Sequence, residues 1–402
     1  MSDYEIPSLQ IDPTALPPPL LTSEPGSFAQ HTFQMRIPHI VDETLGHNHF
    51  PPDIRENLLD LRTEIRDGRI RQLREVAPDV GFWRAVSAPF EGRSWLDVPW
   101  YWAEAYFYRR LLEATRYFQA GAGQGFDPFS ALKSDEWQPA GAPRAVEELM
   151  SALPAEGNAR FAALVRASLW GNRIDLSYRS VAGLGIAHGA SANLLVDDTE
   201  QVWRLLRRRP ADKVIVVNDN AGTELAMDLA LADFLLGSGL AAQVVLHLKQ
   251  QPFFVSDALP GDVQEALGAL AAGPRHGAEL AARLIAHLET GRLHLRTHWF
   301  YTTSLFYFQL PADLQTELAA AGLVVVKGDA NYRRLCGDAH WSAMTPFSAA
   351  SVYFRAPLLA LRTLKSEIIL GLRAGEAERL STQDPDWLVN GKRGVIQASL
   401  RS

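Results

Sequence analysis

Apolar residues recur at helical spacing through the first part of the chain. The clearest stretch follows Asp53, where four apolar side chains fall on one face of a helix with 3.6 residues per turn: Ile54, Leu58, Leu61 and Ile65. The helical pattern continues in three further segments: residues 100–118, 145–153 and 159–169. No segment before about residue 190 has the pattern of a strand. The sequence therefore predicts a helical domain over residues 31–180, preceded by a Pro-rich arm over residues 1–30.

Beyond about residue 190 the pattern changes to short apolar runs separated by helical stretches. Four runs have the pattern of strands: residues 213–217, 243–248, 293–297 and 323–326. Helices are expected between and after them: from about residue 223, over residues 276–288 and 313–320, and finally over residues 358–372. Strands that alternate with helices are typical of a parallel sheet covered by helices. We expect residues 181–402 to form such a domain, with the boundary near residues 150–190.

Composition narrows the class of protein. The 402 residues include 39 basic and 46 acidic side chains, for a net charge of −7, and 47% are hydrophobic. These values are typical of a folded globular enzyme and argue against disorder or nucleic-acid binding. A single cysteine, Cys336, excludes an intramolecular disulfide and a cysteine-based zinc site. No apolar run reaches about 18 residues and no signal-peptide pattern is present, so we expect a cytoplasmic protein with no membrane partner.

Polar side chains follow three of the predicted strands, in the segments 218–222, 253–257 and 327–333. Ligands of an open parallel sheet bind beyond the carboxyl ends of its strands, so we expect these segments to meet at one site. Oxygen ligands such as Asp219, Asn220 and Asp257 suit Mg²⁺ or Mn²⁺, and the nearby Lys and Arg side chains suit a phosphate group. A purely structural role is the alternative, because Asp and Asn are also common in turns and at helix N-termini.

Other motifs fit less well. Ala221 stands where a haloacid-dehalogenase-type phosphatase has its second aspartate, and residues 183–189 are glycine-rich without the spacing of a dinucleotide-binding loop. The chain contains no Walker A motif, no Gly-x-Ser-x-Gly and no His-Glu-x-x-His. The aromatic segment 100–108 has the character of core, although Glu104 and Arg109 could face a cleft.

Several segments stand in a distinctive order along nearly the whole chain: Ser168–Ser177, Asn218–Gly222 with Glu224 and Asp228, Phe254–Asp257, Lys327–Arg333 and Arg362-Thr-Leu-Lys365. In this order they resemble the metal-dependent damage-control phosphatase family, and specifically its third subfamily, whose signature is Arg-Thr-x-Lys. The resemblance implies an α/β fold in which a helical N-terminal domain precedes an α/β/α sandwich with a mostly parallel sheet.

The resemblance also implies roles for individual residues. Asp219, Asn220 and Asp257 would hold a divalent metal ion, which would be Mn²⁺, Co²⁺, Mg²⁺ or Ni²⁺. Asp219, Asp257 and Lys365 would be the catalytic residues. Substrate contacts would come from Asp219 and Asn220 and from a second group of residues: Asp329, Ala330, Asn331, Tyr332, Arg333 and Lys365. The partner would be a small phosphorylated metabolite.

Two further expectations concern the surroundings of the site. Asn172 and Asp175 lie in one of the matching segments and would support the metal-binding residues. Lys365 is expected on the final predicted helix, where it would share a face with Arg362 because the two residues are three apart.

These features predict a metal-dependent phosphomonoesterase. Phosphoryl transfer depends mainly on positioning and on neutralising the phosphoryl oxygens, which a metal ion, Lys365 and backbone N–H groups after Gly328 would do. The expected substrates are sugar phosphates, such as fructose 1-phosphate or a related hexose phosphate, or a similar phosphometabolite. Two alternatives stay open. One is an S-adenosylmethionine-dependent protein-glutamate O-methyltransferase, an activity also attributed to the family, and the other is a non-catalytic phosphometabolite-binding protein.

Overall fold

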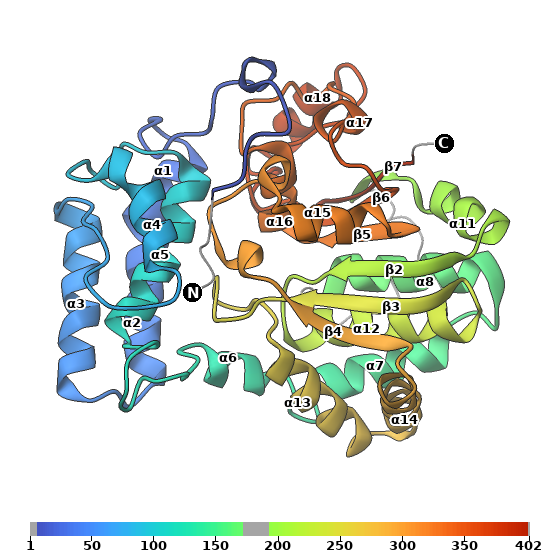
Figure 1. Cartoon of the computed structure of the whole chain (residues 1–402). Helices are drawn as coiled ribbons and strands as arrows, with labels where there is room; N and C mark the ends of the chain where they lie inside the picture. The colour runs from blue at the N-terminus through green and yellow to red at the C-terminus, as the bar shows by residue number, and fades with distance from the viewer. Residues whose placement is uncertain (1–5, 172–192, 401–402) are drawn as a thin grey trace.

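The computed structural model describes residues 6–171 and 193–400. Figure 1 shows a group of N-terminal helices (blue to teal) beside a sheet that is covered by helices. Asn172, Asp175 and the glycine-rich segment 183–189 lie outside the described residues, so what the sequence predicts for them stays a prediction.

The N-terminal part of the chain is helical. Its helices are α1 (Phe28–His31), α2 (Ile37–His47), α3 (Pro52–Asp67), α4 (Val80–Ser87), α5 (Trp100–Ala114) and α6 (Ser130–Asp135). A π-helical turn, Thr32–Arg36, joins α1 to α2. In α3 the four apolar residues expected on one face are all buried. Every residue of α5 is buried, because this helix packs on the other helices on one side and on the sheet domain on the other.

Within the described residues, seven strands form one sheet in the order β1-β7-β6-β5-β2-β3-β4. The strands are β1 (Leu194–Asp197), β2 (Ala211–Val217), β3 (Ala241–Leu248), β4 (Leu293–Thr297), β5 (Leu323–Lys327), β6 (Leu358–Thr363) and β7 (Gly394–Ser399). Neighbouring strands are parallel except β6 and β7, which pair antiparallel. The mostly parallel sheet predicted from the sequence is confirmed.

Helices cover both faces of this sheet. One face packs against α7 (Ala142–Ala152), α8 (Gly157–Trp170), α11 (Thr199–Arg208), α12 (Gly222–Gly237), α13 (Pro260–Ala271) and α14 (Arg275–Glu289). The other face packs against α15 (Ala312–Ala319), α16 (Asp329–Cys336), α17 (Phe347–Ala350) and α18 (Glu376–Gln383). Side chains of β2 alternate between the two layers, because successive strand residues point to opposite faces: Val214 and Val216 to the first, Ile215 and Val217 to the second. The arrangement is an α/β/α sandwich.

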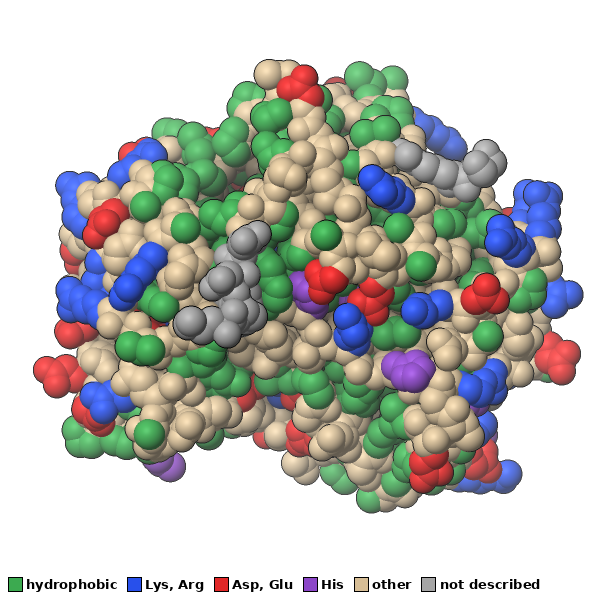
Figure 2. Space-filling model, viewed as in Figure 1, with side chains coloured by type: hydrophobic (Ala, Val, Ile, Leu, Met, Phe, Trp, Pro, Cys, Tyr) green, Lys and Arg blue, Asp and Glu red, His purple; other side chains and the backbone are tan. Residues whose placement is uncertain are grey.

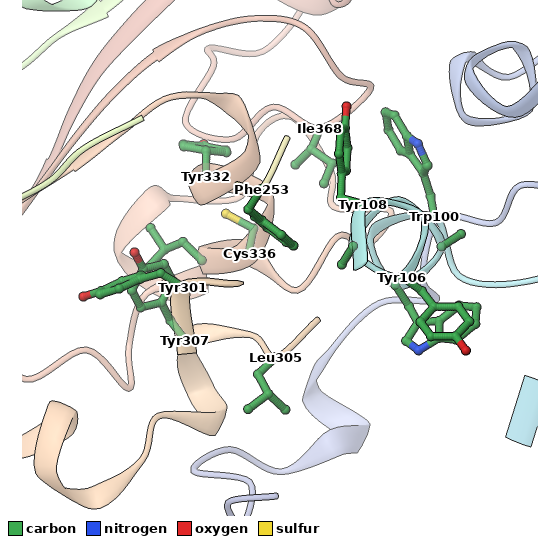
Figure 3. Close-up of a cluster of buried hydrophobic side chains, with 14 of the residues drawn as sticks. Trp100, Tyr106, Tyr108, Phe253, Tyr301, Leu305, Tyr307, Tyr332, Cys336 and Ile368 are labelled. Carbon is green, nitrogen blue, oxygen red and sulfur yellow. The ribbon is translucent and has the colours of Figure 1, made fainter. Parts of the chain in front are cut away.

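The N-terminal helices share a hydrophobic core with the second face. Figure 3 shows aromatic side chains of α5 beside side chains from α16 and the neighbouring loops: Trp100, Tyr106, Tyr108, Phe253, Tyr301, Tyr307 and Tyr332. The Pro-rich arm is anchored to the same region. The N–H of Leu20 donates to the carbonyl of Asp338 at 2.9 Å, and that of Thr22 donates to the carbonyl of Val98 at 3.0 Å.

The helix predicted over residues 358–372 is wrong. Leu358–Thr363 form β6, which lies between β5 and β7 in the sheet. A short apolar run such as Leu358–Leu361 fits a buried helix or a buried strand equally well by its pattern. The segment forms a strand because it makes hydrogen bonds to β5 on one side and to β7 on the other. The sequence pattern also does not predict β1 or β7. In the sequence, α18 stands between β6 and its antiparallel partner β7.

Charged side chains are distributed over the outer helices. On the face shown in Figure 2, described basic side chains occur on both the α3 side and the α11 side and are interspersed with acidic ones. Among residues 6–171 and 193–400, no helix combines the length and the apolar character needed to cross a bilayer.

Candidate metal and phosphate site

A cavity of about 110 Å³ lies at the carboxyl ends of β2, β3, β5 and β6. The segments that follow these strands form one wall, and α5 and the π-helical turn before α2 contribute to the other. Seven of the residues expected at the site line this cavity: Asp219, Asn220, Asp257, Asp329, Ala330, Arg333 and Lys365. The topology of the sheet thus brings together segments that are far apart in the sequence.

Main-chain hydrogen bonds hold the loops after β2 and β3 together. Asn220 and Asp257 form an isolated antiparallel bridge. The N–H of Ala221 donates to the carbonyl of Ser256 at 2.7 Å, and the N–H of Ala258 donates to the carbonyl of Asp219 at 2.8 Å. These contacts place the side chains of Asp219, Asn220 and Asp257 at one point of the cavity wall.

The three side chains are buried and polar, with 8%, 7% and 3% of Asp219, Asn220 and Asp257 exposed. Asn220 Nδ2 donates to Asp219 Oδ2 and to Glu224 Oε2, both at 2.8 Å. Lys249 Nζ lies 3.1 Å from Asp257 Oδ2. The amide of Asn220 is therefore held by two carboxylates, which fixes the orientation of its oxygen.

Acidic groups accumulate here at an electrostatic cost. Burial raises the pKa of Asp219 well above its ordinary value, and the nearby carboxylates of Asp257 and Glu224 raise this pKa further. Burial also raises the pKa of Asp257, against the opposing effect of the Lys249 ammonium. A bound cation would offset this repulsion, so the cluster favours a positively charged ligand.

The donor atoms fit a hard divalent ion. Two carboxylates and an amide oxygen form an all-oxygen set, which suits Mg²⁺ or Mn²⁺ better than Zn²⁺. Asp257 Oδ2 is buried and has the Lys249 ammonium 3.1 Å away, but a carboxylate carries further lone pairs that are available to a metal ion. In the described part of the chain, no three His, Cys, Asp or Glu side chains are grouped as metal ligands. The amide of Asn220 is what completes the proposed set.

Lys365 lines the same cavity as these acids, and its charge acts on Asp219. Its surroundings differ from the sequence-based expectation. It follows β6 instead of lying on a helix, and Arg362 is a fully buried residue of that strand. The prediction that the two share a helix face is therefore wrong. Arg362 Nε donates to Asp329 Oδ1 at 2.7 Å, whereas the Lys365 ammonium lines the cavity and forms no ion pair with any residue that the structure describes.

Asp329 is the first residue of α16 and is held by three donors. Besides Arg362, the N–H of Lys365 donates to Asp329 Oδ1 at 3.1 Å, and Ser366 Oγ donates to it at 3.0 Å. Burial is the largest single influence and would raise the pKa of Asp329, but the charges of Arg362 and Arg333 and the hydrogen bonds to Asp329 together outweigh it and lower the pKa overall. Asp329 is thus a stable anion that ties the β6 end to the start of α16.

The other residues expected to contact substrate are placed differently. Arg333 lines the cavity, but its guanidinium lies 3.6 Å from the ring centre of Trp100 and pairs with Asp338 and Glu104. The side chains of two residues do not reach the cavity. The amide of Asn331 donates to the carbonyl of Lys327 at 2.9 Å, and the hydroxyl of Tyr332 donates to Gln397 Oε1 at 2.8 Å.

Similarity to known proteins shows the family of this chain. A family model described as the damage-control phosphatase ARMT1-like domain matches residues 32–380. The chain belongs to the ARMT1-like damage-control phosphatase family. It is 32% identical to the damage-control phosphatase ARMT1 of Danio rerio, over 96% of this chain and 97% of that protein. It is 30% identical to the protein of that name from Homo sapiens, over 95% of this chain and 98% of that protein.

A solved structure of a DUF89 family protein from Pyrococcus horikoshii covers 92% of this chain and 96% of its own, at 16% identity and a TM-score of 0.49. Membership in the ARMT1-like family supports a phosphatase that acts on small phosphorylated metabolites.

Sequence reasoning did not assign two cavity residues of this ARMT1-like chain. Glu224, on α12, stands in one of the matching segments and holds Asn220. Arg36 ends the π-helical turn and lines the cavity from the N-terminal side, without an ion pair to any described residue. No sequence signal marks Arg36, because only tertiary packing brings its turn to the site.

The sequence suggested that Glu104 and Arg109 could face a cleft. Glu104 does line the cavity, whereas Arg109 is buried elsewhere against Glu75 and Asp79.

Proposed function

We propose that the protein is a divalent-metal-dependent phosphomonoesterase that hydrolyses sugar phosphates, with fructose 1-phosphate and related hexose phosphates as the first candidates. One observation carries the proposal. A buried group of two carboxylates and an amide, Asp219, Asp257 and Asn220, lines the same cavity as the lysine of the Arg-Thr-x-Lys signature. A cation site and an ammonium in one cavity suit a substrate that carries an anionic phosphoryl group.

Asp219, Asn220 and Asp257 would hold the metal ion, which when bound polarises a phosphate oxygen and makes a water molecule more acidic. Lys365 neutralises charge on the phosphoryl oxygens from the other side, and its flexible stem lets the ammonium follow the group as its geometry changes. Asp329 keeps the main chain at Lys365 in place through the hydrogen bond from its N–H.

The helices α12 and α16 begin beside the cavity, at the ends of β2 and β5, and their N-termini differ. The N-terminus of α12 already carries the carboxylate of Glu136, whose Oε2 accepts from the N–H of Thr223 at 2.7 Å. The start of α16, at Gly328 and Asp329, lines the cavity. Its first N–H groups would therefore contribute to phosphate binding.

The aromatic part of the cavity lining suits the sugar. Trp100, Tyr108 and Phe254 contribute aromatic surface there, and Arg36 and Glu104 contribute polar groups. An apolar wall with a few polar groups is typical of small-molecule sites. Arg36 approaches from the N-terminal helices, and we assign it to substrate binding.

A phosphate-release screen tests the proposal. Purified protein is assayed with hexose, pentose and triose phosphates in Mg²⁺, Mn²⁺, Co²⁺ or Ni²⁺, with Asp219→Asn as the matched inactive variant. Metal-dependent release from at least one sugar phosphate, lost in the variant, is the expected result. A parallel incubation with S-adenosylmethionine and analysis for base-labile methyl esters covers the methyltransferase alternative. Methyl transfer without phosphate release would overturn the proposal, and binding without either reaction would favour a phosphometabolite-binding protein.

A further inference from the structure

The segment at the end of α6 contacts both loops that carry the proposed metal ligands. α6 lies between the N-terminal helices and the sheet domain (Figure 1). Its residue Lys133 reaches the loop after β3, and Glu136, the residue at its C-terminal cap, reaches the start of α12 after β2. Neither residue lines the cavity itself.

Lys133 holds the main chain that follows Asp257. Its side chain is 3% exposed, and its Nζ lies 3.0 Å from the carbonyl oxygen of Asp257, 3.0 Å from Asp262 Oδ2 and 2.7 Å from Asp127 Oδ2. Asp262 in turn accepts from the N–H of Leu259 at 2.7 Å, at the beginning of α13. One ammonium thus fixes the loop at Asp257 and at the helix that follows.

Glu136 holds the other loop. Its carboxylate accepts from the N–H of Thr223 in the first turn of α12, and a negative charge at a helix N-terminus is favourable. The contact is tight, because a Cβ at Gly222 would lie 2.2 Å from Glu136 Oε2. Gly222 also has a φ of +67°. Gly222 lies two residues after Asn220, so this contact fixes the main chain next to Asp219 and Asn220.

We propose that Lys133 and Glu136 are positioning residues of the metal site, which hold Asp257 and the pair Asp219–Asn220 in the arrangement that binds one divalent ion. This inference rests on the proposed function. The two loops are hydrogen-bonded to each other, so α6 holds them as one unit. Groups that orient metal ligands without touching the metal typically change metal affinity by about 10- to 100-fold.

Metal binding by the full-length protein provides the test. Wild type and variants are stripped with a chelator and titrated with Mn²⁺ by calorimetry, without substrate. Lys133→Met and Glu136→Ala are each expected to raise the Kd for Mn²⁺ by about tenfold or more. Glu136→Gln should recover part of the affinity, because its amide oxygen still accepts from the N–H of Thr223.

Asp233→Asn is the matched control. Asp233 is a buried acid on the same helix α12, and it pairs with Arg283 away from the cavity. Its replacement is expected to lower the melting temperature without changing the Kd for Mn²⁺. If the control also raised the Kd for Mn²⁺, any loosening of α12 would be enough to weaken metal binding. That result would contradict a specific positioning role for Lys133 and Glu136.

The outcomes separate this inference from the proposed function. If wild type binds no divalent ion, the proposed metal site is wrong and the positioning role falls with it. If wild type binds Mn²⁺ and the folded variants bind it within about threefold of wild type, only the positioning role is overturned. Should Lys133→Met fail to fold because Asp127 and Asp262 lose their partner, the comparison of Glu136→Ala with Glu136→Gln decides the question.

Discussion

The carboxylate of Asp219 packs directly against Gly328. A Cβ at position 328 would lie 2.0 Å from Asp219 Oδ2, and Gly328 has a φ of +85°, which favours glycine. The end of β5 is thus shaped to admit an aspartate from the end of β2. Close contact across two neighbouring parallel strands is what places Asp219 beside the start of α16.

Gly328→Ala should therefore remove activity by displacing Asp219. We expect a loss of metal affinity of at least about tenfold, with a stability cost of about 1–3 kcal/mol, because a φ of +85° with a ψ of 169° is a backbone conformation that is essentially restricted to glycine. Gly375→Ala is the control, because Gly375 has a φ of +75° and no atom near the position of a Cβ. Equal activity in the two variants, measured by phosphate release and Mn²⁺ titration, would contradict the steric argument.

Lys365→Ala tests the cation opposite the acids. Loss of a charge that stabilises the transition state should lower kcat/KM by about 100-fold or more, which corresponds to about 2.7 kcal/mol. Folding should stay near wild type, because the ammonium forms no ion pair with any described residue. Lys392→Ala, at an exposed lysine in the neighbouring turn, should be silent. Turnover by Lys365→Ala within about threefold of wild type would show that this residue is not catalytic.

Metal removal should abolish phosphate release. The acidic cluster is expected to bind Mg²⁺, Mn²⁺ or Co²⁺ through oxygen ligands, so exhaustive dialysis against chelator should inactivate the protein and one of these ions should restore it. In the Asp257→Asn variant, phosphate release should return only at a much higher metal concentration, because the variant lacks one of the two carboxylate ligands. Full turnover after dialysis, with metal content verified by mass spectrometry, would exclude a metal-dependent reaction.

Arg36→Ala should weaken substrate binding more than it slows turnover. Arg36 lies on the side of the cavity formed by the N-terminal helices, away from Lys365 and the acids in the fold. We expect KM for the best sugar phosphate to rise by about tenfold, the scale of one charge-assisted hydrogen bond. Arg66→Ala, at an exposed arginine of α3, is the matched control. A fall in kcat with unchanged KM would place Arg36 in the chemical step instead.

Stability should decline as the solution becomes mildly acidic, in part through His247. This buried residue of β3 has its Nδ1 2.7 Å from the hydroxyl of Tyr301. Burial lowers the pKa of His247, and the hydrogen bond and charge of Glu317 only partly offset this. Because the folded-state pKa is depressed, the unfolded chain takes up the proton first, at pH values below about 6.5. The free energy of unfolding should therefore fall as the pH drops from about 6.5 toward the lower folded-state pKa.

Urea unfolding at pH 7.5 and in steps down to pH 5 measures this dependence. His247→Gln should flatten the decline, because glutamine takes up no proton. His39→Gln, at a histidine on the surface of α2, should leave it unchanged. A decline of equal slope in wild type and His247→Gln would assign the pH dependence to other groups.

Two parts of the sequence show which strands hydrophobic patterns can predict and which they cannot. The runs at 213–217, 243–248 and 323–326 all form strands within the ranges of β2, β3 and β5, because each is apolar, β-branched and bounded by turn residues. The run at 358–361 has no β-branched residue, and its leucines fit a helix equally well. Only its hydrogen bonds to β5 and β7 distinguish the two, and those partners are not encoded in local spacing.

Local patterns in the chain were enough to predict the class of fold and which polar segments follow the strands. The reason is that hydrophobic periodicity and the grouping of Asp, Asn, Lys and Arg are local properties of the chain. Tertiary structure alone decided the sheet order, which sets β2, β3, β5 and β6 side by side and so brings Asp219, Asp257 and Lys365 to one cavity. It also decided that Arg36 faces that cavity and that α6 supports its loops. Contacts between distant segments depend on packing and on hydrogen-bond partners, and no local pattern specifies either one.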